Sequence, residues 1–160
     1  MTLIELLVLT GNYYTSMIFI AAIILFLLKD KESALFAFIT FVFFFVGITY
    51  YPFLIEWDSN KLYRYPIWIL HDTLWMGLIA YLGLKDKINW RQSVLGQLFC
   101  IPLLAVNFFR ALDMQFIQMY ISTTAYRIVY PLCEVAIVLL CWLPIFVYLK
   151  NKFFVKPQTA

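Results

Sequence analysis

The chain has 160 residues, of which 64% are hydrophobic, 20% aromatic and only 13% charged. Soluble domains are roughly 45–50% apolar and about 25% charged, so this composition excludes an ordinary soluble globular domain. The formal net charge of +3 is small, and the 12 Lys and Arg residues are scattered between apolar blocks instead of forming a basic patch. Nucleic-acid binding therefore has no support, and the composition predicts an integral membrane protein.

The hydrophobic residues are grouped in long blocks. A run of about 18 or more apolar residues with few charges indicates a membrane-spanning helix. The blocks predict an all-α bundle of five transmembrane helices that forms a single domain over residues 1–160. The predicted spans are residues 3–28, 34–55, 66–84, 92–110 and 128–149.

Polar segments separate these blocks along the chain. The first block ends at KDKE, and the second gives way at Glu56 to EWDSNKLYRY. The third opens with Pro66, which is favourable in the first turn of a helix, and it ends at Leu84 before KDK. The fourth is weaker, and the segment that follows it, residues 110–127, is too polar for a sixth span. Its periodicity predicts a short interfacial helix between spans four and five.

The distribution of basic residues predicts the orientation of the bundle. With the N-terminus outside, the inner side holds eight Lys and Arg residues and the outer side four. The inner set is Lys29, Lys31, Lys85, Lys87, Arg91, Lys150, Lys152 and Lys156, and the outer set is Lys61, Arg64, Arg110 and Arg127. Because cytoplasmic loops carry the excess of positive charge, we expect the N-terminus outside and the C-terminus in the cytoplasm. The start lacks a cationic region and a cleavage site, so we expect the first helix to be retained.

A short tetrapeptide recurs at the inner ends of spans one, three and five. Residues 28–31 and 84–87 read LKDK, and residues 149–152 read LKNK. One interpretation is an old duplication of a helix pair, as in some transporters. The other is three independent cationic anchors at the inner interface. A shift of 56 residues gives few other identities, which favours independent anchors.

Polar residues inside the predicted spans fall in one layer. At about 1.5 Å per residue, they lie roughly 20 to 24 Å above the inner anchors, in the outer half of a core about 30 Å thick. The inner half is almost purely apolar. We therefore predict an outward-facing polar pocket. The candidate lining residues are His71, Asp72, Asn107, Arg110, Arg127 and Glu134.

Simpler interpretations exist for several of the charged residues. For five of them an ordinary solvated or snorkelling position at the outer interface is expected. These are Glu56, Asp58, Arg110, Asp113 and Arg127. Arg110 and Asp113 are three residues apart and can form a local ion pair. Arg127 and Glu134 are seven apart on one predicted helix, so they share nearly the same face.

The deeper residues allow two interpretations each. His71 either handles protons or makes an ordinary hydrogen bond inside the bundle. Asp72 and Glu134 either carry a ligand or form structural ion pairs. His71 and Asp72 are adjacent, and neighbouring side chains on a helix point about 100° apart, so the pair does not predict a catalytic dyad.

The sequence carries no signature of a metal, cofactor or catalytic site. A single histidine excludes haem with two histidine ligands, and there is no H-E-x-x-H motif, nucleophile elbow or glycine-rich phosphate loop. All three cysteines, Cys100, Cys133 and Cys141, fall inside predicted spans, which argues against disulfides and a zinc site. We expect no metal and no cofactor, and a membrane enzyme is the weakest of the functional hypotheses.

Two functional hypotheses remain. The first is a small transport, channel or ligand-binding protein whose outer pocket takes a proton, ion or small solute, with Asp72 and Glu134 as its ligands. The second is an accessory, regulatory or immunity-type protein that packs against a larger membrane partner, with a purely structural polar layer. The expected partners are the lipid bilayer and either further copies of the chain or a larger membrane protein. The compact size and the lack of glycosylation sequons favour a bacterial inner membrane.

Overall fold

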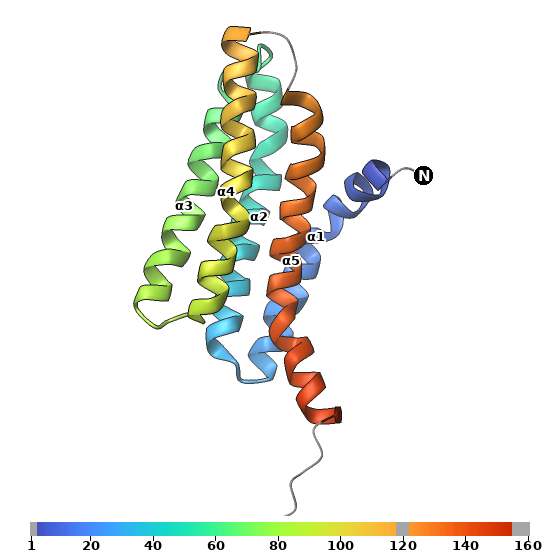
Figure 1. The fold of residues 1–160 in the computed structure, drawn as a ribbon, viewed down its shortest axis with the longest axis vertical. Coiled ribbons are helices and arrows are strands. Elements are labelled where there is room, and N and C mark those ends of the chain that lie inside the picture. The colour runs from blue at the N-terminus through green and yellow to red at the C-terminus, as the bar shows by residue number, and fades with distance from the viewer. Residues whose placement is uncertain (1–2, 118–121, 155–160) are drawn as a thin grey trace, which may run out of the picture.

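A computed structural model describes residues 3–117 and 122–154, with side chains from 13 to 116 and from 122 to 153. The described chain is all helical, without a strand (Figure 1). In chain order its elements are α1 (Leu3–Leu27), α2 (Lys31–Trp57), α3 (Arg64–Leu84), α4 (Trp90–Leu112), the π-helical segment η1 (Asp113–Ile117) and α5 (Ser122–Phe154). The predicted helical bundle is thereby confirmed.

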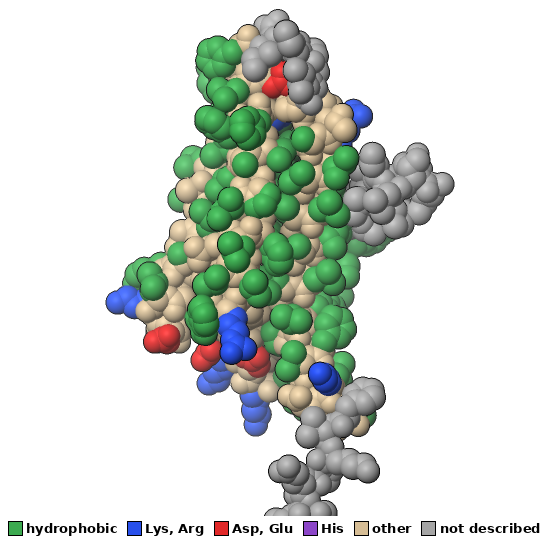
Figure 2. Space-filling view, in the orientation of Figure 1, with side chains coloured by type: hydrophobic (Ala, Val, Ile, Leu, Met, Phe, Trp, Pro, Cys, Tyr) green, Lys and Arg blue, Asp and Glu red, His purple; other side chains and the backbone are tan. Residues whose placement is uncertain are grey.

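Four helices are long and apolar enough to cross a membrane. They are Lys31–Trp57, Arg64–Leu84, Trp90–Phe116 and Ser122–Phe153. The part of α1 with described side chains, Tyr13–Leu27, is apolar but shorter than a full span. Figure 2 shows hydrophobic side chains over the face between the two ends of the bundle, with charged side chains gathered mostly at one end. These features identify a membrane protein, while the fifth span and the orientation stay predictions.

The connection between α4 and α5 differs from the prediction. α4 passes without a break into η1, and α5 already begins at Ser122 instead of residue 128. The backbone N–H and hydroxyl of Ser122 donate to Asp113 Oδ2 at 3.0 and 2.6 Å, which fastens the start of α5 to the end of α4. Within the described residues the predicted short helix between spans four and five corresponds to η1, which continues α4. Its interfacial position stays a prediction, and residues 118–121 lie outside the described part.

Helix packing leaves one weak seam in the bundle. α1 packs extensively against α2 and α5, and α4 against α3 and α5, whereas α2 and α3 make few contacts. Apolar side chains from all five helices form the core, including the fully buried Ile18, Phe36, Ile79 and Cys141. The N-terminal part of α1 points away from the other helices (Figure 1). The bundle is therefore closed around most of its circumference and least tightly between α2 and α3.

The predicted inner half contains polar contacts that the sequence analysis missed. The Gln92 amide donates to the Leu140 carbonyl at 3.2 Å, and the Ser93 hydroxyl donates to the Ile79 carbonyl at 2.8 Å. Both side chains are 3% exposed. α3 and α4 approach so closely here that a Cβ on Gly83 would lie 2.6 Å from Ser93 Oγ. Small and polar residues thus join α4 to its two neighbours, as expected for helices packed in a membrane.

The three L-K-x-K tetrapeptides lie at the same end of the bundle (Figure 1) but adopt three different conformations. In the first, Lys29 has a φ of 63° and Asp30 caps α2 by accepting a hydrogen bond from the Ser33 N–H at 3.2 Å. In the second, Asp86 instead has the positive φ, 52°. The third, residues 149–152, is part of α5. Conformations this different favour independent cationic anchors over a structural repeat.

Candidate functional site

A cavity of about 100 Å³ lies inside the bundle and is lined by side chains from all five helices. α1 contributes Tyr14, α2 Phe43, α4 Cys100 and α5 Glu134, while α3 contributes His71 and its neighbours. Of the six predicted pocket residues, His71, Asp72 and Glu134 line this cavity. The structure therefore brings together residues that are up to 63 positions apart in the chain.

His71 and Asp72 are joined directly, contrary to the expectation from their adjacency. His71 Nδ1 lies 3.3 Å from Asp72 Oδ1, and both side chains are 15% exposed. The Asn107 amide of α4 donates to the other carboxylate oxygen, Oδ2, at 3.4 Å. Asn107 itself is completely buried and stands behind Asp72 instead of lining the cavity. Bending of the two side chains toward each other overcomes the angular separation of their Cα–Cβ bonds.

The imidazole of His71 is surrounded by α2 and by aromatic rings. Its Nε2 lies 3.2 Å from the carbonyl oxygen of Phe43. The ring centroids of Phe43, Tyr50 and Trp68 lie 5.2, 5.8 and 5.5 Å from that of His71. Trp68 fits here because Gly47 has no side chain, since a Cβ on Gly47 would lie 3.3 Å from the indole ring. His71 is thus a main link across the weak seam between α2 and α3.

Glu134 faces the cavity from α5. Its carboxyl is hydrogen bonded to the side chain of Tyr130, one turn earlier on the same helix, and it interacts electrostatically with Asp72. None of the described residues that line the cavity is Lys or Arg. Arg127 is exposed, and no ion pair joins it to Glu134 in the part of the chain that the structure describes. The predicted approach of Arg127 to Glu134 and its place in the pocket are therefore not found.

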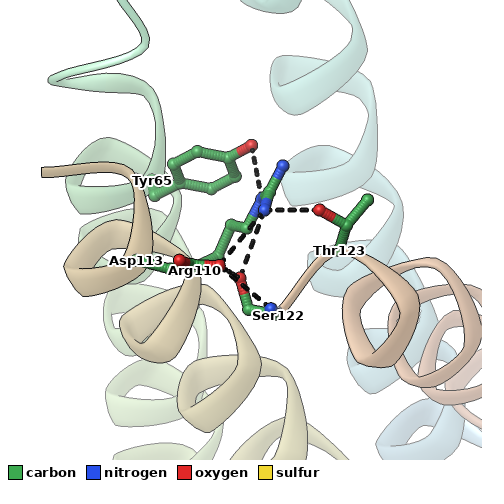
Figure 3. A network of polar contacts seen from close by, with 5 residues as sticks. All are labelled: Tyr65, Arg110, Asp113, Ser122 and Thr123. Carbon is green, nitrogen blue, oxygen red and sulfur yellow. Dashed lines mark hydrogen bonds and ion pairs between the residues drawn. The ribbon is translucent and has the colours of Figure 1, made fainter. Parts of the chain in front are cut away.

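Arg110 lies in the last turn of α4, at the end of that helix away from the L-K-x-K tetrapeptides, and belongs to a separate polar network that Figure 3 shows. Its guanidinium donates to Thr123 Oγ1 at 2.7 Å, to Ser122 Oγ at 3.2 Å and to the Tyr65 hydroxyl at 3.3 Å. Its Nη1 lies 3.6 Å from Asp113 Oδ2, which confirms the predicted local pair. Arg110 and Asp113 are only 7% and 2% exposed, so the prediction of solvated positions is wrong for both.

Asp58 is also buried, at 4% exposure, although the sequence analysis expected it in solvent. Its carboxylate accepts hydrogen bonds from the backbone N–H groups of Leu62, Tyr63 and Arg64, at 2.8, 3.0 and 2.6 Å. These donors belong to the turn that leads into α3, where unpaired N–H groups of a helix start need an acceptor. Asp58 is a structural cap. Glu56 is exposed, in line with its expected solvated position.

Comparison with known proteins adds no family. No protein-family model matches the chain, and neither a curated protein nor a solved structure is significantly similar to it. Within the described residues, no group of three or more His, Cys, Asp or Glu side chains is arranged to hold a metal ion. The function has to be inferred from the cavity itself.

The cavity is chemically suited to a positively charged molecule. Two carboxylates face it, and aromatic rings from four helices make up much of the remaining wall. Trp75 also lines it, is 4% exposed, and has an indole N–H without a hydrogen-bond partner among the described residues. Because buried donors are normally satisfied, this N–H is available to an oxygen atom of water or of a ligand in the cavity.

A more open recess of about 380 Å³ adjoins the cavity. Both share Gly47, Ile48, Trp68 and Tyr130, and the recess continues past Tyr51, Pro52 and Tyr126 between α2, α3 and α5. It follows the weak seam of the bundle toward the end that carries the Arg110 network. The recess is the natural route between the cavity and the surface.

Proposed function

We propose that this protein binds a small cationic solute in the cavity, as a small membrane transporter or ligand-binding protein. The observation that carries the proposal is that Asp72 and Glu134 face one cavity to which no described Lys or Arg contributes. We further propose five spans with the N-terminus outside, so that the recess opens toward the outer side of the membrane. The excess of Lys and Arg at the opposite end supports this orientation.

The energetics of buried charge support a cationic ligand. An ionised carboxylate at membrane depth costs at least about 2.5–3.5 kcal/mol unless it is paired or hydrated. Two carboxylates in one cavity add mutual repulsion, and a cation placed between them relieves it. Aromatic rings attract cations through their negative faces, by about 0.5–2 kcal/mol each. The cavity walls therefore combine the two kinds of group that stabilise a positive charge away from bulk water.

Binding by the purified protein tests the proposal. Titration of detergent-solubilised wild-type protein with tetramethylammonium chloride is expected to give saturable binding, measured by calorimetry against a sodium chloride blank. Glu134→Gln removes one carboxyl group from the cavity wall and is expected to weaken binding at least about tenfold. Glu56→Gln is the matched control, because Glu56 is exposed and does not line the cavity. Wild-type protein that shows no saturable binding would overturn the proposal.

Reconstitution separates binding from transport. In liposomes, uptake of radiolabelled methylammonium above that of empty vesicles, lost in Glu134→Gln but kept in Glu56→Gln, is the result expected of a transporter. Binding without uptake would assign the protein to ligand binding alone. Both experiments use the full chain.

A specific observation favours the accessory hypothesis as a second candidate. On the side of the cavity nearer the L-K-x-K tetrapeptides, the described core is closed by completely buried apolar side chains, among them Ile18, Ile79 and Phe36. A single copy therefore offers no polar path through that half. Purification of a stoichiometric membrane partner together with an absence of cation binding would support the accessory role.

A further inference from the structure

The hydrogen bonds of His71 determine where its protons are. The Phe43 carbonyl oxygen, 3.2 Å from Nε2, can only accept a hydrogen bond, so Nε2 must carry a hydrogen. On a neutral ring Nδ1 would then be an acceptor, and it lies 3.3 Å from an oxygen of Asp72. Two acceptors at this distance repel unless a proton lies between them. The His71–Asp72 contact therefore holds one proton in addition to the hydrogen on Nε2.

The surroundings of the pair favour the imidazole as the carrier of that proton. The Asn107 amide donates to Asp72 Oδ2 at 3.4 Å, which stabilises the ionised form of the carboxyl. The ring centroids of Phe43, Tyr50 and Trp68 all lie within 6 Å of that of the imidazole. The carboxylate of Asp72 at Nδ1 and the carbonyl oxygen of Phe43 at Nε2 both favour a positive charge on His71.

We propose that His71 is held as a doubly protonated imidazolium whose charge cancels that of Asp72, so that the cavity selects organic ammonium ions with a single positive charge. This inference rests on the proposed cation binding for its ligand, while the protonation of His71 stands on its own geometry. Glu134 is then the one carboxyl group of the cavity without a cationic partner among the described lining residues. His71 is a positioning residue that sets the charge of the site.

The other groups that face the pair leave this charge balance unchanged. α1 contributes Tyr14, α2 Tyr50, α4 Cys100 and α5 Tyr130, all of which are uncharged side chains at neutral pH. Cys100 Sγ donates to the backbone carbonyl of Asp72 at 3.8 Å, not to the side-chain carboxylate. The acidic and basic groups that line the cavity among the described residues are therefore His71, Asp72 and Glu134.

The size and lining of the cavity define the ligand further. A cavity of roughly 150 Å³ accommodates benzene, so about 100 Å³ suits an ion smaller than benzene, such as methylammonium, and the methyl groups of tetramethylammonium would extend into the adjoining recess. Larger substituents on the nitrogen would lie in the adjoining recess beside Tyr126 and Tyr130. Trp75, with its unpaired indole N–H, offers a hydrogen bond to an oxygen of the ligand or of a water beside it.

Nitrogen-15 NMR of the histidine tests the charge state directly. His71 is the only histidine of the chain, so labelled histidine gives one pair of ring signals. At pH 7.5 both ring nitrogens of the wild type are expected at the shifts of protonated nitrogen, and Asp72→Asn is expected to convert the ring to the neutral form. Asp86→Asn, at an exposed position of the α3–α4 connection, is the control and should leave the spectrum unchanged. A wild-type ring with one unprotonated nitrogen would overturn the inference.

Ligand charge provides the second test. Wild-type protein is expected to bind tetramethylammonium more tightly than the doubly charged ethylenediammonium ion. His71→Gln keeps a donor for the Phe43 carbonyl but removes the positive charge, so the ratio of affinities should shift toward ethylenediammonium by at least about tenfold. An unchanged ratio in folded His71→Gln protein would refute the selection by charge.

The two proposals can fail separately. Saturable tetramethylammonium binding that depends on Glu134, combined with a neutral His71 ring, would remove the inference and keep the proposed function. If His71 is doubly protonated but the protein binds no cation, the proposed function and the ligand selectivity are refuted. The inferred charge state of His71 would still hold. The NMR measurement on wild-type protein needs no variant, so misfolding of His71→Gln leaves the inference testable.

Discussion

The network around Arg110 gives the sharpest stability prediction. Arg110→Met keeps most of the side-chain volume but removes the charge and the donors to Tyr65, Ser122 and Thr123. It also removes the positive charge that lies 3.6 Å from the carboxylate of Asp113, a residue that is 2% exposed. Breaking one partner of a buried pair costs about 3–5 kcal/mol, and a hydrogen bond to a charged group contributes about 1.5–3 kcal/mol. Because these effects overlap, we expect a loss of about 3–5 kcal/mol in the free energy of unfolding.

Equilibrium unfolding in mixed micelles, followed by circular dichroism, measures this loss. Arg127→Met is the matched control: Arg127 is exposed, so its change should be within about 0.5 kcal/mol. Adding Asp113→Asn to Arg110→Met removes the negative charge of Asp113. The double variant is expected to recover part of the lost stability, because free-energy changes at contacting residues are not additive. Equal effects of Arg110→Met and Arg127→Met would refute the conclusion that the buried network joins α3, α4 and α5.

Three further predictions concern the rest of the bundle. Gly83→Ala places a Cβ 2.6 Å from Ser93 Oγ and should lower the free energy of unfolding by about 1–3 kcal/mol. Gly77→Ala, where a Cβ would meet nothing within 4 Å, is the control and should be neutral or stabilising. Equal thermal stabilities of the two variants would contradict the close approach of α3 and α4. Asp58→Ala removes the acceptor of three backbone N–H groups and should lower the free energy of unfolding by about 1–2 kcal/mol, with wild-type stability as the contrary outcome. In cells or sealed vesicles, a cysteine replacing Lys61 should react with an impermeant maleimide from outside and one replacing Lys87 should not, and the reverse pattern would invert the proposed orientation.

The helices were predictable because each apolar block ends at charged residues. Predicted spans two and three, residues 34–55 and 66–84, fall within α2 and α3, whose bounds are Lys31–Trp57 and Arg64–Leu84. Pattern reasoning failed where the chain continues as a helix through polar residues. Asp113 follows α4 in a helical conformation and binds Ser122, so a segment that is polar in sequence is held by contacts to the start of α5.

The candidate site was predictable as a layer but not as a set of contacts. Depth along a helix follows from residue counting, and it placed His71, Asp72 and Glu134 together. Burial of Asp58 and Arg110 depends on partners in other turns and helices, and their sequence spacing gives no signal of these partners. The aromatic rings around His71 come from α2 and α3, and only the packing of these two helices shows that they surround one imidazole.

The short connections at one end of the bundle determine how the cavity can open. The α1–α2 turn is closed by backbone hydrogen bonds from Lys29 to Phe26 and from Asp30 to Leu25, both 3.1 Å long. Together with the contact of Gly83 and Ser93 between α3 and α4, these bonds make that end rigid. α2 and α3 make few contacts along the seam, but at the opposite end they are joined by the turn of residues 58–63, which Asp58 holds with three hydrogen bonds. The bundle is therefore held at both ends, and access to the cavity is from the side, through the recess between α2, α3 and α5.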